Sequence, residues 1–241
     1  MTGRVLVVQH EDGTDAGRVG QWLGEAGVAL DVRRPDRGDR LPGPYDGDGA
    51  AYDGLLVLGG AMGPADDEAC PWLPAVRALL VDAVDAGLPT LGICLGAELL
   101  AVACGGSVRR GVAGPELGVL DCEPTAAAAD DPLFGALPAR ARVVQWHWEE
   151  IADLPPGAVR LASSAMYENQ AFRLGDRAWA VQGHPEVTGE IAAIWARDDS
   201  PLLKAAGRDP NELVSEVAAA QAELTEAWRP VAHAFAASLA H

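Results

Sequence analysis

The stretch PTLGICLGAELL, Pro89–Leu100, carries the strongest structural signal in this sequence. Its apolar first half predicts a buried strand over Pro89–Ile93, and its second half predicts a helix over Glu98–Ala103. Cys94 stands at the junction, with one glycine two residues before it and another two residues after it. A nucleophile on such a sharp strand-to-helix turn needs small neighbours, because larger side chains at those positions would collide. The stretch therefore predicts a cysteine nucleophile at the end of a strand.

Strands and helices alternate through the first hundred residues, with short connections between them. This alternation is typical of βαβ units, and it predicts an α/β fold with a mostly parallel central sheet flanked by helices. The expected strands are Arg4–Gln9, Val28–Val32, Gly54–Leu58 and Pro89–Ile93, the expected helices Ala16–Ala26 and Trp72–Ala86, and the expected long loop Arg34–Ala51.

The second half of the chain has a different pattern of apolar and turn residues. Between Val108 and Gln182, short strand-like runs separated by turn residues predict antiparallel additions to the sheet. From about residue 190 the pattern is helical and rich in alanine, and we expect Pro201, Pro210 and Pro230 to divide it. Because no linker interrupts the chain, residues 1–241 are predicted to form one domain with a helical C-terminal segment.

Composition excludes several classes of function. The chain has 241 residues, 18 Lys and Arg against 35 Asp and Glu, and a formal net charge of −17. Such an excess of negative charge argues against nucleic acid or an anionic membrane as partner, because both require a basic face. The N-terminus has no signal-peptide core, and no run approaches the roughly 20 apolar residues of a membrane span. We therefore expect a cytoplasmic protein with reduced thiols.

Cys94 is the best nucleophile candidate because it would lie at a helix N-terminus, where free N–H groups and the helix dipole favour a thiolate. The backbone N–H of Leu95 would be placed to meet an oxyanion. The alternative is that Cys94 is simply a buried packing residue. No two cysteines have Cys-x-x-Cys spacing, so a metal site is not expected. Packing is expected for the three other cysteines, Cys70, Cys104 and Cys122.

A thiol nucleophile needs a general base, and His184 in AWAVQGHPEVT has the best setting. It follows a predicted strand, and Glu186 stands two residues further on. In an extended segment these two side chains point the same way, so the carboxylate can orient the imidazole. The alternative is a surface turn. His147 in QWHWEE is the rival base, while structural or solvent-exposed roles are expected for His10, His233 and His241.

The motifs together resemble class I glutamine amidotransferases of the Cys-His-Glu type. They are GICLGAE, the Gly59-Gly60 turn after a strand, and the downstream GHPE. The order of the intervening segments, including GPELG, VVQWHWEE and LASSAMYENQAF, resembles a free-standing group related to the glutaminase half of GMP synthase. The resemblance covers most of Leu55–Thr188 and implies a flavodoxin-like amidotransferase fold.

The resemblance also implies roles for individual residues. Cys94 would be the nucleophile, His184 the base and then the acid, and Glu186 the residue that orients the histidine. The backbone N–H groups of Gly60 and Leu95 would form the oxyanion hole. No metal or cofactor is implied. The residues implied in binding the glutamyl group are Met62, Glu98, Asn169, Gln170, Ala171 and Phe172.

Two departures from the family pattern concern the substrate. Glu98 stands where the family usually has glutamine, and an ionised carboxylate would only accept hydrogen bonds and would favour a substrate ammonium. Gly183 replaces an aromatic residue and is expected to widen the space beside His184. No part of the 241 residues resembles a synthetase domain, so any acceptor chemistry is expected on a separate protein.

Three functions follow from this pattern. The first is hydrolysis of the glutamine amide through a γ-glutamyl thioester, with ammonia passed to a separate acceptor enzyme. The second is hydrolysis of γ-glutamyl peptides or amines without ammonia transfer. The third is a non-catalytic regulatory module that has kept the fold.

Overall fold

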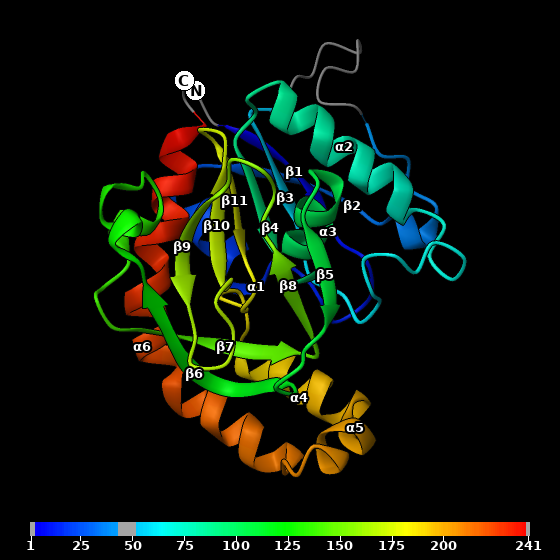
Figure 1. Ribbon diagram of the computed structural model, residues 1–241, viewed down its shortest axis with the longest axis vertical. Helices are drawn as coiled ribbons and strands as arrows, with labels where there is room; N and C mark the ends of the chain where they lie inside the picture. The colour runs from blue at the N-terminus through cyan, green and yellow to red at the C-terminus, as the bar shows by residue number, and fades with distance from the viewer. Residues whose placement is uncertain (1–2, 43–51, 240–241) are drawn as a thin grey trace.

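The computed structural model describes residues 3–42 and 52–239 and has an α/β architecture (Figure 1). In this described part, nine strands form the main sheet in the order β2-β1-β3-β4-β11-β10-β9-β6-β7. The pairings from β2 to β11 are parallel, and those from β11 to β7 are antiparallel. This arrangement confirms the predicted parallel sheet with antiparallel additions.

The strands and helices have the following bounds. The parallel strands are β1 Arg4–Val8, β2 Ala29–Arg33, β3 Gly54–Val57, β4 Thr90–Ile93 and β11 Ala178–Val181. The antiparallel strands are β6 Glu116–Pro124, β7 Ala141–His147, β9 Val159–Ser163 and β10 Ala171–Leu174, and a separate ribbon pairs β5 Ser107–Arg110 with β8 Glu149–Asp153. The helices are α1 Gly17–Glu25, α2 Leu73–Asp85, α3 Leu95–Ala103, α4 Gly189–Asp198, α5 Ser200–Ala205 and α6 Pro210–Ser238.

Helices cover both faces of the parallel half of the sheet, and side chains on each strand alternate between the two faces. On β1, Val5 and Val7 contact the cluster that includes α1 and α6, whereas Leu6 and Val8 contact the cluster of α2 and α3. All four are essentially inaccessible to solvent. The apolar runs of the sequence therefore mark strands buried on both sides.

The register of the parallel strands brings three connections together at one edge of the sheet. Gly92 on β4 pairs with Val57 on β3, and Ile93 on β4 pairs with Val181 on β11. The residues just after these strands include Gly59-Gly60, Cys94 and His184. Functional groups in such sheets gather beyond the carboxyl ends of the strands, so this edge is where a site is expected.

Three local expectations are corrected. The helix after Cys94 begins at Leu95 rather than Glu98. The expected loop Arg34–Ala51 contains a short 3₁₀ helix over Pro35–Arg37, and its residues 43–51 lie outside the described part of the chain. Pro230 does not end a helix but lies inside α6, whose packing against α1, α4, β6 and β7 compensates for one missing hydrogen bond. Pro201 and Pro210 do stand in the first turns of α5 and α6.

In the described residues, no helix is both long enough and apolar enough to cross a membrane. All four cysteines are free thiols.

Candidate active site

Cys94 occupies a strained turn between β4 and α3. Its φ of 50° and ψ of −109° make it the single non-glycine residue with positive φ in the described chain. A β-carbon on Gly92 would approach the carbonyl oxygen of Gly96 to 2.6 Å, and one on Gly96 would overlap the carbonyl oxygen of Val57. The two glycines are thus required by the close approach of backbone on both sides of the turn. Strain of this kind persists where the surrounding structure enforces it, and it is common at active sites.

The thiol of Cys94 is buried, with 6% of the residue exposed. Burial raises its pKa well above the usual value, and the nearby Glu98 and Glu186 raise it further. The N–H of Leu95 acts in the opposite direction. This corrects the expectation that the helix N-terminus favours a thiolate, because burial and two carboxylates outweigh it. The raised pKa favours the thiol over the thiolate, so the chemistry calls for a base that removes its proton.

His184 is held in place by three contacts. Its Nδ1 lies 2.7 Å from Oε1 of Glu186, which confirms the expected contact, although Pro185 and Glu186 form a turn rather than the expected extended segment. Its backbone N–H donates to the carbonyl of Val144 on β7 at 2.7 Å. The Trp195 ring of α4 packs on the imidazole with centroids 4.7 Å apart. Because Glu186 engages Nδ1, Nε2 is the ring nitrogen left to exchange protons.

Gly59 brings Cys94 and His184 together. A β-carbon at this glycine would lie 3.0 Å from Cε1 of His184 and 3.6 Å from Cβ of Cys94. Both side chains therefore contact the backbone of this turn. At Gly60, a β-carbon would lie 3.0 Å from a methyl carbon of Leu95, so the two backbone segments implied in the oxyanion hole are neighbours.

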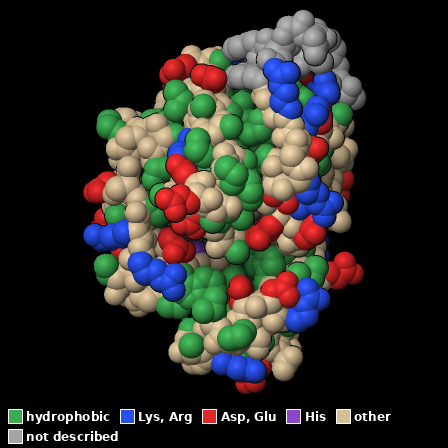
Figure 2. All heavy atoms as spheres, turned by 90° about the vertical axis from the view of Figure 1, so that its right-hand side faces the viewer, with side chains coloured by type: hydrophobic (Ala, Val, Ile, Leu, Met, Phe, Trp, Pro, Cys, Tyr) green, Lys and Arg blue, Asp and Glu red, His purple; other side chains and the backbone are tan. Residues whose placement is uncertain are grey.

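Gly60, Cys94 and His184 line a cavity of about 300 Å³. Figure 2 shows a hollow above the C-terminal helices, with acidic side chains around it and hydrophobic ones inside. The expected residues that line the cavity are Gly60, Met62, Cys94, Glu98 and His184. Leu95 and Glu186 are not among the lining residues. Leu95 follows Cys94 in the chain, and Glu186 contacts Nδ1 of His184.

The four-residue segment Asn169–Phe172 is not among the residues that line this cavity, and its role in binding the glutamyl group stays a prediction. Asn169 donates to the backbone carbonyl of Ile151, and Phe172 is fully buried in the core. Gln170 donates to the carboxylate of Glu116, which in turn contacts His147. The segment stands behind the cavity wall, and the side-chain amides are used inside the protein.

The sequence did not reveal the aromatic and acidic walls of the cavity. One wall comes from the end of β7, the residues after it and Arg110 at the end of β5, and the other comes from the β1–α1 loop, α4 and α5. Their lining residues include Trp146, His147, Trp148, Glu149 and Arg110 on one side, and Glu11, Asp12, Ile194, Trp195, Asp198, Asp199 and Leu202 on the other. The run QWHW at the end of a predicted strand was the available signal for the first wall.

His147, the rival base, lines the cavity but has both ring nitrogens engaged. Its Nδ1 lies 2.6 Å from the carbonyl oxygen of Glu149, and its Nε2 lies 3.1 Å from Oε2 of Glu116. His10 accepts a hydrogen bond from Trp72, and burial lowers its pKa to about 4. Both are structural in this arrangement.

His233 on α6 is partly exposed and lies 3.5 Å from a carboxylate oxygen of Glu25, while His241 lies outside the described residues. Among residues 3–42 and 52–239, no three His, Cys, Asp or Glu side chains converge as metal ligands would.

Glu98 lies one helical turn beyond Cys94 and is 3% exposed. Its Oε1 accepts a hydrogen bond of 2.9 Å from the amide of Gln182. Burial raises its pKa to about 7. Near neutral pH the carboxyl group is therefore substantially protonated, and in that form it can donate as well as accept, as a glutamine does. The expectation of a fully ionised carboxylate is corrected accordingly.

Gly183 does not widen the cavity. A β-carbon there would meet the side chain of Val143 at 2.6 Å and Oε1 of Gln145 at 3.1 Å, and neither residue lines the cavity. The glycine is present because β7 packs directly on the backbone before His184.

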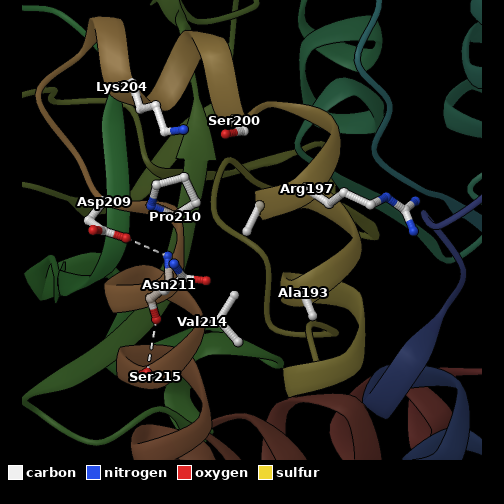
Figure 3. A pocket seen from close by; sticks show the side chains of 10 residues that line it. Ala193, Arg197, Ser200, Lys204, Asp209, Pro210, Asn211, Val214 and Ser215 are labelled. Carbon is white, nitrogen blue, oxygen red and sulfur yellow. Dashed lines mark hydrogen bonds between the residues drawn. The ribbon is translucent and has the colours of Figure 1, made fainter.

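A second hollow of about 720 Å³ lies among α4, α5 and α6 (Figure 3). Its walls carry Lys204, Arg197 and Asp209, and the carboxylate of Asp209 caps α6 by accepting from the N–H of Asn211. This hollow contains no cysteine or histidine, so the chemistry of the cavity around Cys94 has no counterpart there.

Known proteins provide an independent comparison. Residues 19–193 match the family model described as glutamine amidotransferase class-I. The chain is 31% identical over 171 residues to gamma-glutamyl peptidase 4 of Arabidopsis thaliana, covering 70% of this chain and 66% of the relative. It is 39% identical over 109 residues to the glutamine-hydrolysing GMP synthase subunit of Methanoculleus marisnigri, covering 45% of this chain and 57% of the relative. The chain thus spans less than two thirds of the length of both relatives, 66% of the first and 57% of the second.

Solved structures agree with the sequence relatives. The crystal structure of a glutamine amidotransferase from Thermotoga maritima superposes with a TM-score of 0.86 and 29% identity, covering 98% of this chain and 99% of that one. One from Methylobacillus flagellatus has a TM-score of 0.85 and 29% identity, covering 99% and 96%. The fold, the extent of the family match and these relatives lead to one conclusion: the chain belongs to the class I glutamine amidotransferase family.

Proposed function

We propose that this protein hydrolyses a γ-glutamyl amide bond with Cys94 as nucleophile. The observation that supports this most directly is that a buried thiol and an oriented imidazole lie against the same backbone residue, Gly59, and line one cavity. A thiol, a base within the same cavity and a carboxylate that orients the base are the parts that acyl transfer needs. The imidazole is oriented at 2.7 Å by Glu186.

The first half of the reaction forms a thioester. Nε2 of His184 takes the thiol proton as Sγ of Cys94 attacks the γ-carbonyl carbon, and a C–S bond forms. The carbonyl oxygen becomes an oxyanion, for which the N–H groups of Gly60 and Leu95 are the candidate donors. The C–N bond then breaks, and the imidazolium gives its proton to the departing nitrogen. The products of this half are a free amine and a γ-glutamyl thioester.

The second half releases glutamate. Water attacks the thioester carbon, and His184 takes a proton from that water. The C–S bond breaks, and the imidazolium returns its proton to the sulfur of Cys94. Glu186 stabilises the imidazolium in both halves, because its carboxylate stays within hydrogen-bond distance of Nδ1. No proton is gained or lost by the protein over the full cycle.

Glu98 is suited to bind the α-amino-acid end of the glutamyl group. It lies on the helix that begins at Cys94, and it contributes to the lining of the cavity. Its carboxyl can accept from an ammonium when ionised and can donate to a carboxylate when protonated. Met62 and the turn before it also line the cavity.

Transfer of ammonia to a separate acceptor enzyme is a second candidate function. The observation that favours it is the 39% identity to the GMP synthase subunit of Methanoculleus marisnigri, which is described as glutamine-hydrolysing. In this case glutamine is the donor, and an acceptor enzyme stimulates its hydrolysis. With a net charge of −17 on this chain, a basic docking face on that enzyme is expected.

The test measures glutamate release from glutamine and from a set of γ-glutamyl amines and dipeptides. Cys94→Ala should reduce release from the best donor by at least about 10⁴-fold, because the thioester route is lost. Cys104→Ala, at a half-buried cysteine on the far end of α3, is the matched control and should retain activity. Full activity of Cys94→Ala would refute the mechanism, and an inert wild type would refute hydrolysis of these donors.

A further inference from the structure

The side of the cavity that holds the leaving amine follows from the role of His184. In the proposed reaction the imidazolium protonates the departing nitrogen, so the amine must lie against His184. The cavity residue in contact with this imidazole is Trp195 of α4, with ring centroids 4.7 Å apart. The wall formed by α4, the start of α5 and the β1–α1 loop is therefore the leaving-group wall.

The leaving-group wall is built as one unit from segments far apart in sequence. Nε1 of Trp195 donates to the carbonyl of Gly13 at 2.9 Å, which joins α4 to the β1–α1 loop. Nε1 of Trp146 donates to Oδ2 of Asp199 at 2.9 Å, which joins β7 to the α4–α5 junction. The two indole rings also pack edge to face with centroids 5.7 Å apart. The wall thus combines aromatic surface with fixed carboxylates.

Two of its carboxylates, Glu11 and Asp199, form no ion pair with Lys or Arg in the described part of the chain. Oε1 of Glu11 accepts from the N–H of Ala61 at 2.6 Å. Burial raises the pKa of Glu11, and the negative charge of Asp199 raises it further, so the two carboxylates act on each other. By contrast, Asp12 pairs with arginines outside the cavity, and Asp198 pairs with Arg197.

Glu98 is a further acidic side chain of the cavity, on the helix that begins at Cys94. The residue is 3% exposed and lines the cavity, and its Oε1 is held by Gln182. No hydrogen bond to its Oε2 exists within residues 3–42 and 52–239. Arg110 is the single Lys or Arg among the described lining residues, and it lies on the opposite wall, 3.1 Å from Glu149 and above the ring of Trp148.

We infer, on the basis of the proposed γ-glutamyl hydrolysis, that the preferred substrates are γ-glutamyl amides of diamines or polyamines. Their leaving amine carries a second, distal ammonium, which Glu11 and Asp199 bind while its methylene chain packs on Trp195. A cation beside aromatic faces and unpaired carboxylates is favoured in a partly desolvated site. An amine that ends in a carboxylate, as in a γ-glutamyl peptide, meets like charges in the same place.

The test uses three γ-glutamyl amides of equal length that differ in the charge of the leaving amine. They are the amides of 1,4-diaminobutane, butylamine and 4-aminobutanoate, with distal charges of plus one, zero and minus one. Glutamate release gives kcat/KM for each. The cationic amide should exceed the neutral one by about tenfold, and the anionic amide should be the poorest. Equal values for the three, or a preference for the anionic amide, would overturn the inference.

Variants locate the source of the preference. Glu11→Gln and Asp199→Asn keep the acceptors for Ala61 and Trp146 but remove charge, and each should lower the cationic-to-neutral ratio several-fold. Asp176→Asn removes the same charge from a fully exposed turn and should leave the ratio unchanged. If a variant does not fold, the wild type still tests the charge preference, because added salt should screen the carboxylates and lower the cationic-to-neutral ratio of kcat/KM. An unchanged ratio in both folded variants would refute the assignment to Glu11 and Asp199.

The outcome also separates this inference from the proposed function. Hydrolysis of all three amides without charge preference refutes the inference alone. Absence of hydrolysis of these amides and of glutamine refutes both.

Discussion

Replacement of Glu98 by glutamine tests the electrostatics of the cavity without any assumption about substrate. Glu98→Gln keeps the size of the side chain and the carbonyl oxygen that accepts from Gln182. It removes a carboxyl group whose pKa burial raises from 4.5 to about 7. The folded state therefore binds a proton that the unfolded state has already released between these two pH values. Stability of the wild type must fall as the pH rises through this window.

The size of the effect follows from the two pKa values. Because of this difference, Glu98 lowers the free energy of unfolding of the wild type by about 3 kcal/mol at pH 8 and by about 1 kcal/mol at pH 5. Because the glutamine does not titrate, Glu98→Gln should be the more stable protein at pH 8. Its advantage over the wild type should shrink by about 2 kcal/mol when the pH is lowered to 5.

The assay is urea-induced unfolding followed by tryptophan fluorescence at pH 5 and pH 8. Glu68→Gln, at an exposed glutamate of the loop before α2, controls for the general loss of one negative charge. The control should show a much smaller change between the two pH values. The reasoning is refuted if the stability difference between Glu98→Gln and the wild type is the same at both pH values, or if the wild type is more stable at pH 8.

Two further predictions concern the turn at Cys94 and the ring beside His184. Gly96→Ala should prevent folding or destabilise the protein severely in denaturant titrations, because its β-carbon would overlap the carbonyl oxygen of Val57. The control is Gly24→Ala on α1, where a β-carbon has no atom within 4 Å, and it should raise the free energy of unfolding by about 0.5–1 kcal/mol. Equal effects at the two sites would contradict the steric account. Trp195→Ala should lower kcat more than it changes KM and should move the pH profile of kcat, because the ring fixes the imidazole of His184. Trp195→Phe keeps an aromatic ring and should restore much of kcat. An unaltered pH profile in the alanine variant would refute this positioning role.

Local patterns were sufficient to predict the parallel half of the fold and the turn at Cys94. Each buried strand is an apolar run bounded by turn residues, and each flanking helix has apolar residues at helical spacing, so the signal lies within a short window. The same applies to Gly92 and Gly96, whose need arises from a turn only a few residues long. The contact between His184 and Glu186 was also predicted, but from an extended segment, whereas the structure makes it across a turn at Pro185 and Glu186.

The walls of the cavity could not be predicted in this way, because they depend on contacts between distant segments. Trp195 is 182 residues away from Gly13, to which it donates a hydrogen bond, and on its own helix it is one apolar residue among several. Gly183 looked like an opening beside the base, but the strand that fills the space is some forty residues earlier in the chain. The state of Glu98 also follows from burial, which a sequence motif does not contain.

The reacting groups and most of the leaving-group wall belong to different parts of the chain, with Glu11 of the β1–α1 loop as the exception. Cys94, His184 and the Gly59-Gly60 turn are carried by the ends of neighbouring parallel strands, whereas Trp195 and Asp199 come from short helices added after the sheet is complete. Substitutions in those helices can change which amine is accepted while the strained turn and its glycines stay constant. Natural selection and protein engineering therefore have a small, separate region of sequence on which to diversify this family's substrates without rebuilding the catalytic apparatus.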